Sequence, residues 1–329
     1  MKRGDFAGAG TLEGGTIPLV DIARSLEHGD PAAIADALTG AATDVGFFYL
    51  AGHGIDPALT MRAFATAREF FALPEEIKGS VAVGTDQRGW MASGMSRLEG
   101  AATHDLKEVF FWGSETAPDD PDVLAGKPLV APNRWPSERF PRLERALRPY
   151  HEAVCGIAPH VLSALAMGLG APADVFTPHY RKPLARGQLV YYPPSAAEDE
   201  GERRFGVAPH TDFGVLTLLA QDRQGGLQVR TRAGHWVEAP PIPDTLVCNI
   251  GDLLQRWSND RLVSTPHRVI NRSGHARHSI PIFFDPHTDT RIDPCELGVA
   301  AADARYAPVT AGEHIRGRNR KSFAQFAAR

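Results

Sequence analysis

The chain has 329 residues, 43% of them hydrophobic and 22% charged, which is enough to bury a core as one large domain or two small ones. This composition is typical of a globular protein, and no apolar run approaches the roughly 20 residues that a membrane span needs. The formal net charge is −4, and Lys and Arg are scattered, so we expect no nucleic-acid partner and no membrane partner.

The cysteines and the N-terminus bear on the compartment. The chain has three cysteines, far apart and without a CxxC pair: Cys155, Cys248 and Cys295. This pattern argues against a disulfide framework or a thiolate zinc site and predicts a reducing compartment, the cytoplasm. Residues 1–15 are Gly-rich and lack the apolar stretch of a secretory signal, so we expect a mobile tail there.

Residues 16–115 read as a mixed α/β cap. The dipeptides Asp30-Pro31 and Asp56-Pro57 each combine an N-cap residue with proline at the first helical position, and apolar residues follow each at helical spacing. Short apolar runs precede each helix signal and predict strands. The first third of the chain therefore predicts alternating strands and helices.

Residues 137–169 predict one long helix that acts as a spine for a sheet. Apolar residues recur through this segment at helical spacing. Pro149 and Pro159 lie inside it, so we expect a kink or a break at one of them.

After Pro183 the pattern changes to short β-rich runs separated by turn residues, which we assign to a core at 183–290 followed by a C-terminal segment at 291–329. Many short strands after a helical spine predict an antiparallel double sheet, either a jelly roll or a cupin-like barrel. The fold class is therefore mostly β with α, in one domain. The predicted strands are QLVYY, GVLTLLA, LQVR, HWVEA, TLVCNI, HRVIN and SIPIFF.

The segment Ala-Pro-His-Thr-Asp-Phe-Gly contains the most informative pair, His210 and Asp212. Two positions apart on a strand, both side chains leave the same face, while Thr211 points to the other. An imidazole beside a carboxylate supplies two of the three ligands of a facial 2-His-1-carboxylate metal site. His267, which opens a later β-run, is the candidate for the third. From the residues alone, these are either metal ligands or hydrogen-bonded polar residues in a turn.

Ten motifs of the chain follow one another in a familiar order and spacing: IPLVD, GFFYLAGHGI, AREFFALP, DLKEVFFWG, YYPP, PHTDFGVLTLL, GGLQV, NIGDLLQRWSN, STPHRVIN and RHSIPIFFDP. In these motifs the chain resembles the isopenicillin N synthase-like family of Fe(II)/2-oxoglutarate-dependent dioxygenases. The resemblance implies a double-stranded β-helix (jelly-roll) core. It also implies that His210, Asp212 and His267 bind Fe(II), with 2-oxoglutarate as cosubstrate and O2 as oxidant.

Arg277 and Ser279 form an RxS pair on one face of a predicted strand. An arginine fork can bind a carboxylate through two parallel hydrogen bonds, and the serine hydroxyl adds a third donor. From residue types alone, Arg277 pairs either with an anionic ligand or with an internal acid such as Asp285. The resemblance implies that the pair binds the distal carboxylate of 2-oxoglutarate.

Tyr192 lies on one strand face with Gln188 and Val190. The resemblance implies that the Tyr192 hydroxyl assists in holding the cosubstrate, and a core tyrosine is the alternative. The chain departs from plant members of the family at Val190, where asparagine is usual. Gln188 can substitute from the same face.

The pocket walls are expected to be aromatic. Candidates are Phe213, Phe284 and the run from Phe110 to Trp112, each of which is either a wall or a core residue. Met95 and Arg97 are candidates for a substrate lid. Arg97 or Arg186 matters if the substrate is an acid.

The function implied by the resemblance is oxidation of a small organic molecule, by hydroxylation or desaturation, with release of succinate and CO2. The alternative within the fold is an iron oxidase that does not use 2-oxoglutarate, as in isopenicillin N synthase-like cyclisation. A binding protein without turnover is the alternative from another class, and the intact ligand set argues against it. We expect a monomer.

Overall fold

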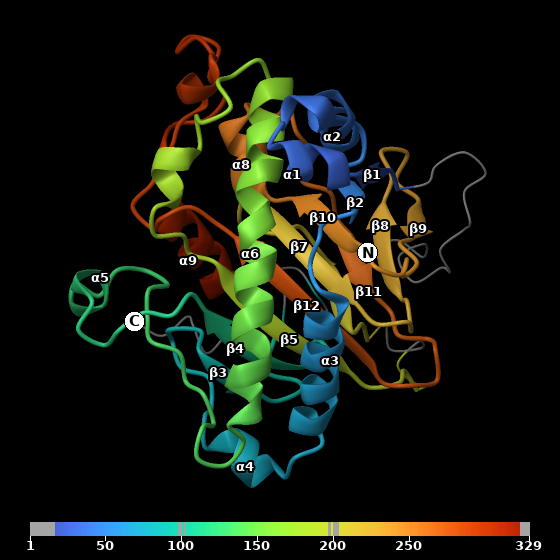
Figure 1. Cartoon of the computed structure of the whole chain (residues 1–329). Coiled ribbons are helices and arrows are strands. Elements are labelled where there is room, and N and C mark those ends of the chain that lie inside the picture. Colours follow the sequence, from blue (N-terminus) through green and yellow to red (C-terminus); the bar gives the residue numbers. More distant parts are fainter. Residues whose placement is uncertain (1–16, 98–100, 102, 197–198, 200–203, 323–329) are drawn as a thin grey trace.

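The computed structural model describes residues 17–97, 101, 103–196, 199 and 204–322, and two facing β-sheets form its centre (Figure 1). The expected tail at 1–15 lies outside this part. The larger sheet has eight strands in the order β1-β2-β10-β7-β12-β5-β4-β3, and all neighbours are antiparallel except β1 and β2. Its strands are β1 (Leu19–Asp21), β2 (Phe47–Ala51), β3 (Gly89–Met91), β4 (Glu108–Gly113), β5 (Arg186–Tyr192), β7 (Leu216–Gln221), β10 (Leu246–Ile250) and β12 (Arg277–Phe284).

The smaller sheet has four strands in the order β6-β11-β8-β9. They are β6 (Val207–His210), β11 (His267–Val269), β8 (Leu227–Arg230) and β9 (Trp236–Glu238). Val207, Leu227 and Val269 of this sheet share one buried cluster with Val190 and Val247 of the larger sheet. The jelly-roll prediction is confirmed in the form of two facing sheets that do not close into a barrel.

Strand alternation separates the two faces of the large sheet. Along β12, Arg277, Ser279, Pro281 and Phe283 line a cavity between the sheets. Ile280, Ile282 and Phe284 instead join the apolar core on the helix side. Because successive side chains of a strand point to opposite faces, a single strand supplies both the site and the core.

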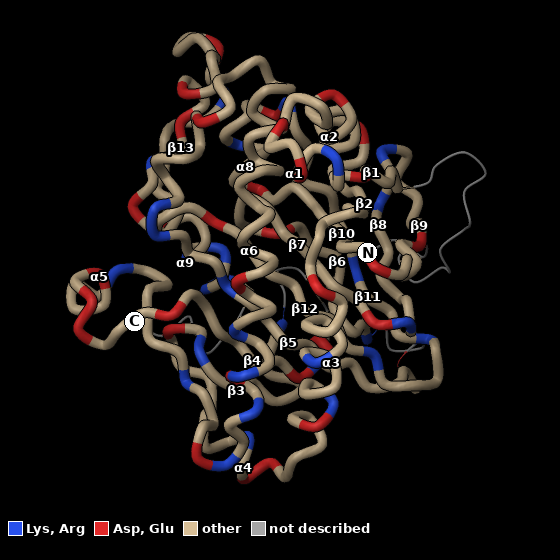
Figure 2. Tube along the Cα trace, in the orientation of Figure 1, with Lys and Arg blue, Asp and Glu red and all other residues tan. Residues whose placement is uncertain are grey.

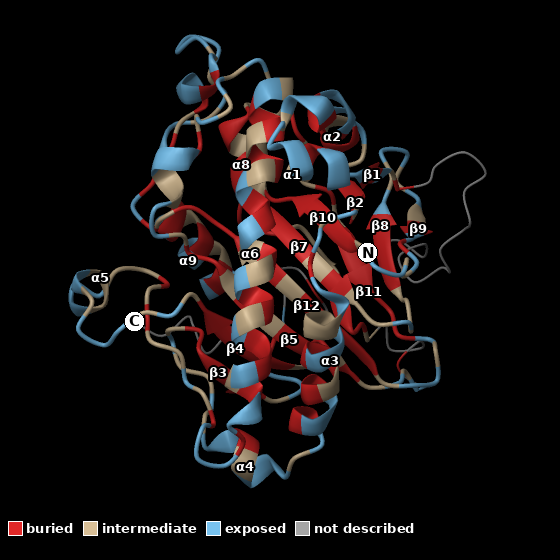
Figure 3. Cartoon of the chain, in the orientation of Figure 1, coloured by how far each residue is buried: buried red, intermediate tan, exposed pale blue. Residues whose placement is uncertain are grey.

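Helix α6 (Arg142–Gly168) covers the outer face of the large sheet and is the predicted spine (Figure 1). Figure 3 shows that the sheet behind it is largely buried, whereas the helix itself alternates between exposed, intermediate and buried residues. Pro149 and Pro159 both lie inside this helix, which continues past each of them without a break. Its buried stripe packs with α2 (Ala32–Asp44) and α3 (Pro57–Phe71), so tertiary packing stabilises the helix despite the missing N–H groups.

The predicted helix start is confirmed at Asp56, whereas at Asp30 it is one residue early, because α2 begins at Ala32 with Pro31 as its N-cap. The Asp56 side chain accepts from Ala58 N at 2.8 Å, with Pro57 as the first residue of α3. Asp30 accepts from Ala32 N at 3.1 Å at the start of α2. The remaining elements are α1 (Ala23–His28), α4 (Glu75–Gly79), α5 (Pro121–Leu124), α8 (Asp252–Trp257), α9 (Ala311–Ser322), two 3-10 turns at Thr177–Tyr180 and Pro294–Leu297, and the β13 (Arg291–Ile292) and β14 (Val309–Thr310) pair.

Strands of the first third pair directly with later strands, since β2 bonds to β10 and β4 bonds to β5.

Figure 2 shows Lys and Arg interspersed with Asp and Glu over the chain trace. Among the helices of the described residues, none has the length and apolar character that crossing a membrane requires.

Candidate active site

Three side chains converge where the two sheets face each other. His210 ends β6 and His267 begins β11, and the two are direct partners in the register of these strands. Their ring centroids are 4.2 Å apart. Asp212 Oδ1 lies 3.7 Å from His267 Nε2 and 3.9 Å from His210 Nε2. The structure thus brings the three predicted ligands together, with one ligand atom of each within 4.8 Å of the others.

The second nitrogen of each imidazole is occupied by the backbone. His210 Nδ1 lies 2.8 Å from Ala208 O, and His267 Nδ1 lies 3.1 Å from Thr265 O. Since a carbonyl oxygen only accepts, each Nδ1 carries the proton and donates it. This leaves each Nε2 as the nitrogen that faces the centre, where a neutral imidazole offers its lone pair to a metal.

The second oxygen of Asp212 is held in the same way. Asp212 Oδ2 accepts from Thr217 Oγ1 at 2.6 Å and from Asn249 Nδ2 at 2.8 Å, which leaves Oδ1 facing the imidazoles. Thr217 on β7 and Asn249 on β10 were not among the predicted site residues. The sequence feature that could have indicated them is a polar residue on the inward face of an otherwise apolar strand.

Electrostatics favour a neutral His210 beside an ionised Asp212. Burial, with the adjacent His267, lowers the pKa of His210 to about 3. Burial alone would raise the pKa of Asp212, but the two histidines and the hydrogen bonds from Asn249 and Thr217 lower it. Two imidazole nitrogens and one carboxylate oxygen with an open side form the donor set typical of non-haem Fe(II), so the residues fit that metal.

Arg277 lies in the same cavity and is fully buried, at 0% exposure. Its Nε donates to Gly225 O at 2.6 Å and its Nη2 to Gln221 Oε1 at 3.5 Å. Its Nη1 has no hydrogen-bond partner among the described residues. Pairing with Asp285 does not occur, since that carboxylate bonds to Arg186 at 2.8 Å. A buried guanidinium with a free donor is costly, so the cavity fits an anion.

All six predicted site residues line this one cavity: Tyr192, His210, Asp212, His267, Arg277 and Ser279. The Arg277 guanidinium stacks over the Tyr192 ring, 4.7 Å from its centroid. Val190 and Gln188 line the cavity as well, so an amide side chain is present beside the position where plant relatives carry asparagine.

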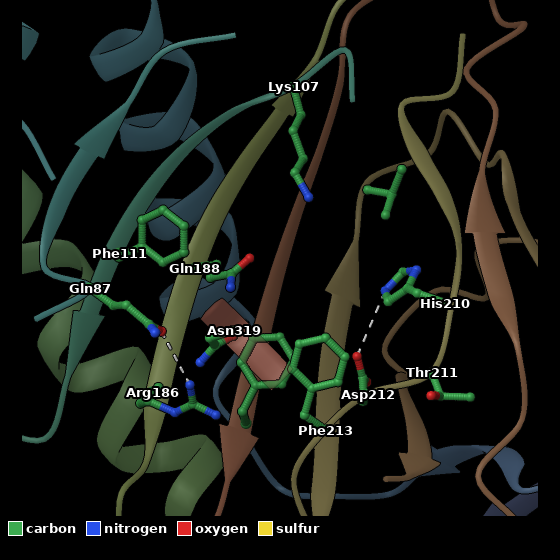
Figure 4. Close-up of a pocket in the computed structure, with 12 residues that line it drawn as sticks. Gln87, Lys107, Phe111, Arg186, Gln188, His210, Thr211, Asp212, Phe213 and Asn319 are labelled. Carbon is green, nitrogen blue, oxygen red and sulfur yellow. Dashed lines mark hydrogen bonds and ion pairs between the residues drawn. The ribbon is translucent and has the colours of Figure 1, made fainter. Parts of the chain in front are cut away.

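A second cavity adjoins the first and shares His210 and Asp212 with it (Figure 4). Phe111 and Phe213 line it, as predicted for pocket walls. Its polar lining comes from separate parts of the chain: Gln87, Lys107, Arg186, Gln188, Thr211 and Asn319. Of these, Gln87, Lys107 and Asn319 were not predicted, because nothing in their local sequence marks them. Thr211 was expected to point away from His210 and Asp212, but it lines this cavity with them, because β6 ends at His210 and strand alternation does not extend to Asp212.

Three of the predicted walls belong elsewhere. Phe284 stacks on Tyr180 at 4.8 Å and belongs to the core on the helix side. Phe110 and Trp112 belong to that same core, because they alternate with Phe111 on β4.

The predicted lid residues lie outside the two cavities that contain His210 and Asp212. Met95 is 44% exposed, and Arg97 donates from Nε to Ala101 O at 2.9 Å.

Two family descriptions match the chain. Residues 17–138 match the non-haem dioxygenase in morphine synthesis N-terminal family, and residues 187–286 match the 2OG-Fe(II) oxygenase superfamily. Among curated relatives, the 2-oxoglutarate-dependent dioxygenase citB of Monascus ruber is 36% identical over 289 residues, covering 85% of this chain and 88% of its own. Homoarginine-6-hydroxylase 2-ODD-233 of Oryza sativa subsp. japonica is 33% identical, covering 91% of this chain and 95% of its own.

Solved structures are similar as well. A full-length Neurospora crassa protein in complex with alpha-KG and thymine superposes with a TM-score of 0.81 at 29% identity, covering 95% of this chain and 99% of its own. A 2OG-Fe(II) oxygenase family protein from Caulobacter crescentus has a TM-score of 0.80 at 33% identity, covering 93% of this chain and 99% of its own.

Proposed function

The chain belongs to the 2OG-Fe(II) oxygenase superfamily, and from this premise we propose that His210, Asp212 and His267 hold its iron and that Arg277, Ser279 and Tyr192 hold 2-oxoglutarate. The protein is an Fe(II)- and 2-oxoglutarate-dependent dioxygenase that oxidises a small organic molecule with release of succinate and CO2. The relatives named for 2-oxoglutarate and the neighbour with bound alpha-KG favour this reaction over an oxidase that dispenses with it.

The observation that carries the iron assignment is the way each of the three side chains is oriented. Two backbone carbonyls bind the Nδ1 atoms, and Thr217 and Asn249 bind Asp212 Oδ2. What remains free is one atom of each side chain, and these atoms face a common point. Such outer contacts fix ligand orientation before the metal arrives.

The assignment of 2-oxoglutarate rests on the unpartnered Nη1 of Arg277. The cosubstrate is a dicarboxylate, and an arginine fork matches a carboxylate in geometry and charge. Ser279 is two positions along the same strand face, and the Tyr192 ring lies under the guanidinium. The fork lies in the same cavity as the three iron ligands, so one end of the cosubstrate can bind Arg277 while the other reaches the metal.

When bound, Fe(II), 2-oxoglutarate and O2 supply the oxidising power, with one oxygen atom going to succinate and the other to oxidation of the substrate. The protein's own residues position the reactants and exclude water. Phe213 and Phe111 wall the adjoining cavity, where the substrate sits beside His210 and Asp212. We propose hydroxylation or desaturation there, as the hydroxylase name of the rice relative suggests.

We further propose that the chain acts as one oxygenase domain and as a monomer in the cytoplasm, without a nucleic-acid or membrane partner. Strands of the first third are hydrogen-bonded into the same sheet as the jelly-roll strands, which supports a single domain. Cys155, Cys248 and Cys295 are unpaired, in keeping with a reducing compartment.

The test measures the affinity of the native protein and of Arg277→Ala for 2-oxoglutarate. Apo-protein is loaded with Fe(II) without oxygen, 2-oxoglutarate is added, and the visible metal-to-ligand charge-transfer band is recorded. We expect a band for the native protein and at least a roughly 100-fold weaker 2-oxoglutarate affinity for Arg277→Ala, because hydrogen bonds to charged groups contribute about 1.5–3 kcal/mol each.

Arg268→Ala is the matched control. Arg268 is as buried as Arg277 and adjoins His267, but its guanidinium stacks over Trp236 at 4.3 Å, away from the cavity. Thermal unfolding of both variants reports whether they fold. Native affinity for 2-oxoglutarate in Arg277→Ala would overturn the proposed role of this residue, and failure of Asp212→Ala to lose iron would overturn the metal site.

A further inference from the structure

The residues that line the second cavity indicate the chemical class of the substrate. We infer that the substrate is a neutral, planar molecule with amide-type carbonyl groups, such as a cyclic amide or imide, and that Asn319 helps to select it. This inference rests on the proposed function, because it takes the cavity beside His210 and Asp212 as the substrate pocket.

Both cations of this cavity are already neutralised within the protein. Lys107 Nζ lies 3.1 Å from Asp105 Oδ2, and Arg186 Nη2 lies 2.8 Å from Asp285 Oδ2. The two carboxylates are themselves held, since Asp105 Oδ1 accepts from Ala208 N and Asp285 Oδ1 accepts from Val215 N. A substrate carboxylate would therefore have to compete with a buried acid for each cation.

That competition disfavours an acidic substrate. Removing a carboxylate from water costs several kcal/mol, and only a free cation offsets the cost. The guanidinium with an unpaired Nη1 among the described residues, that of Arg277, lies in the first cavity, and we have assigned it to 2-oxoglutarate. The second cavity offers a substrate hydrogen bonds rather than charge.

Its hydrogen-bonding groups are mainly carboxamides. Gln87, Gln188 and Asn319 come from three distant segments and lie across the cavity from His210 (Figure 4). Asn319 is 5% exposed, and its Nδ2 has no hydrogen-bond partner among the described residues. The Nε of Arg186 is likewise buried without a partner in that part of the chain. Two buried free donors require acceptors, and carbonyl oxygens supply them without charge.

The apolar lining fits a flat molecule. Phe111, Phe213 and Phe283 all contribute to the cavity wall, and aromatic rings pack favourably against planar groups. Helix α9 is held against this wall, because the Arg318 guanidinium stacks over the Phe213 ring at 4.8 Å and pairs with Asp252 at 3.4 Å. Asn319, the next residue, is therefore placed by two independent contacts of its neighbour.

The experiment compares matched neutral and acidic probes. The protein is loaded with Fe(II) and 2-oxoglutarate without oxygen, so that no turnover occurs, and the charge-transfer band is checked first. Binding of uracil against orotate, and of benzamide against benzoate, is then measured by calorimetry. Each pair shares a ring and differs by a carboxylate. We expect the neutral member of each pair to bind at least about tenfold more tightly.

Asn319→Asp tests the residue itself. This nearly isosteric change replaces the free donor with a carboxylate oxygen, and we expect uracil affinity to fall about tenfold, the cost of leaving a buried partner unsatisfied. Arg316→Gln is the control, because it lies on the exposed side of α9 and changes the net charge by the same amount. It should bind uracil as the native protein does.

Three outcomes would overturn the inference: acids that bind as well as their neutral partners, no binding of either neutral probe at millimolar concentration, or unchanged uracil affinity in folded Asn319→Asp. The check made before any probe is added separates this inference from the proposed function. A missing band counts against the assigned cosubstrate site, whereas a normal band with the wrong probe preference counts against the substrate class alone.

Discussion

The two faces of the large sheet are both buried but hold entirely different side chains. The outer face packs its strands against α2, α3 and α6 through an almost continuous apolar core. The inner face, directed at the small sheet, contributes Arg277 and the two residues that hold Asp212, Thr217 and Asn249. His210 and His267 come from the small sheet opposite. Strands β5, β7, β10 and β12 contribute alternate residues to each face, so the same backbone supports both.

The difference shows how the fold keeps stability and chemistry apart. The outer face is stabilised by the hydrophobic effect, which is non-directional and draws on many residues. On the inner face each buried polar group needs a specific partner. Arg277 Nη1 and, on α9, Asn319 Nδ2 have none among the described residues, and both residues line a cavity. Changes on the outer face should therefore alter stability, and changes on the inner face should alter binding.

The largest expected effect is on the outer face. Leu165 of α6 is 0% exposed, and Leu165→Ala should lower the free energy of unfolding by about 2–5 kcal/mol because a cavity remains in the core. Urea unfolding followed by circular dichroism measures this loss. At temperatures where the variant is folded, its Fe(II) and 2-oxoglutarate affinities should equal those of the native protein. A lower affinity for either would contradict the view that the outer face affects stability alone.

A smaller effect is expected from Thr217→Val on the inner face. This change keeps the shape but removes the donor to Asp212 Oδ2, so the carboxylate is less firmly oriented. Fe(II) affinity, measured by competition with a chelator, should fall about 10- to 100-fold.

Thr66→Val supplies the comparison, since Thr66 is a buried threonine of α3 on the helix side. Equal loss of iron affinity in both variants would mean that Thr217 acts through general packing and not through Asp212.

The smallest effect concerns a polar pair within the outer core. His151 Nδ1 accepts from Trp112 Nε1 at 2.9 Å, and burial, together with nearby Arg88, lowers the pKa of His151 from 6.5 to about 4. As the pH falls, His151 is protonated in the unfolded chain before it is protonated in the folded protein. The stability that the neutral, buried His151 contributes is therefore fully present above pH 6.5 and is lost as the pH falls toward 4.

His151→Gln should remove this acid sensitivity while keeping an acceptor for Trp112. Between pH 7 and pH 5, the variant should lose about 1–2 kcal/mol less unfolding free energy than the native protein. Urea unfolding at both pH values measures the difference. Parallel losses would show that this histidine is protonated as easily in the folded protein as in the unfolded chain.

Strand alternation explains why three of the predicted pocket walls are wrong. Alternation on β12, with Arg277 and Ser279 facing inward, already places Phe284 on the helix side. The same rule separates Phe111 from Phe110 and Trp112 on β4. The sequence allows these assignments, because once one residue of a strand is assigned to a face, alternation assigns the others.

The sequence by itself determined the strands, the helix caps and the pairs that share a strand face, because these depend on residues a few positions apart. The spacing of Arg277 with Ser279 is of this kind, whereas Asp212 lies beyond the end of β6 at His210. Only the tertiary structure decided which distant residues meet. It brings Thr217 and Asn249 to Asp212 and places Asn319 of α9 at the second cavity. It also pairs Asp285 with Arg186 and leaves Arg277 Nη1 without a partner among the described residues. Such contacts depend on sheet order and helix packing, which local spacing does not encode.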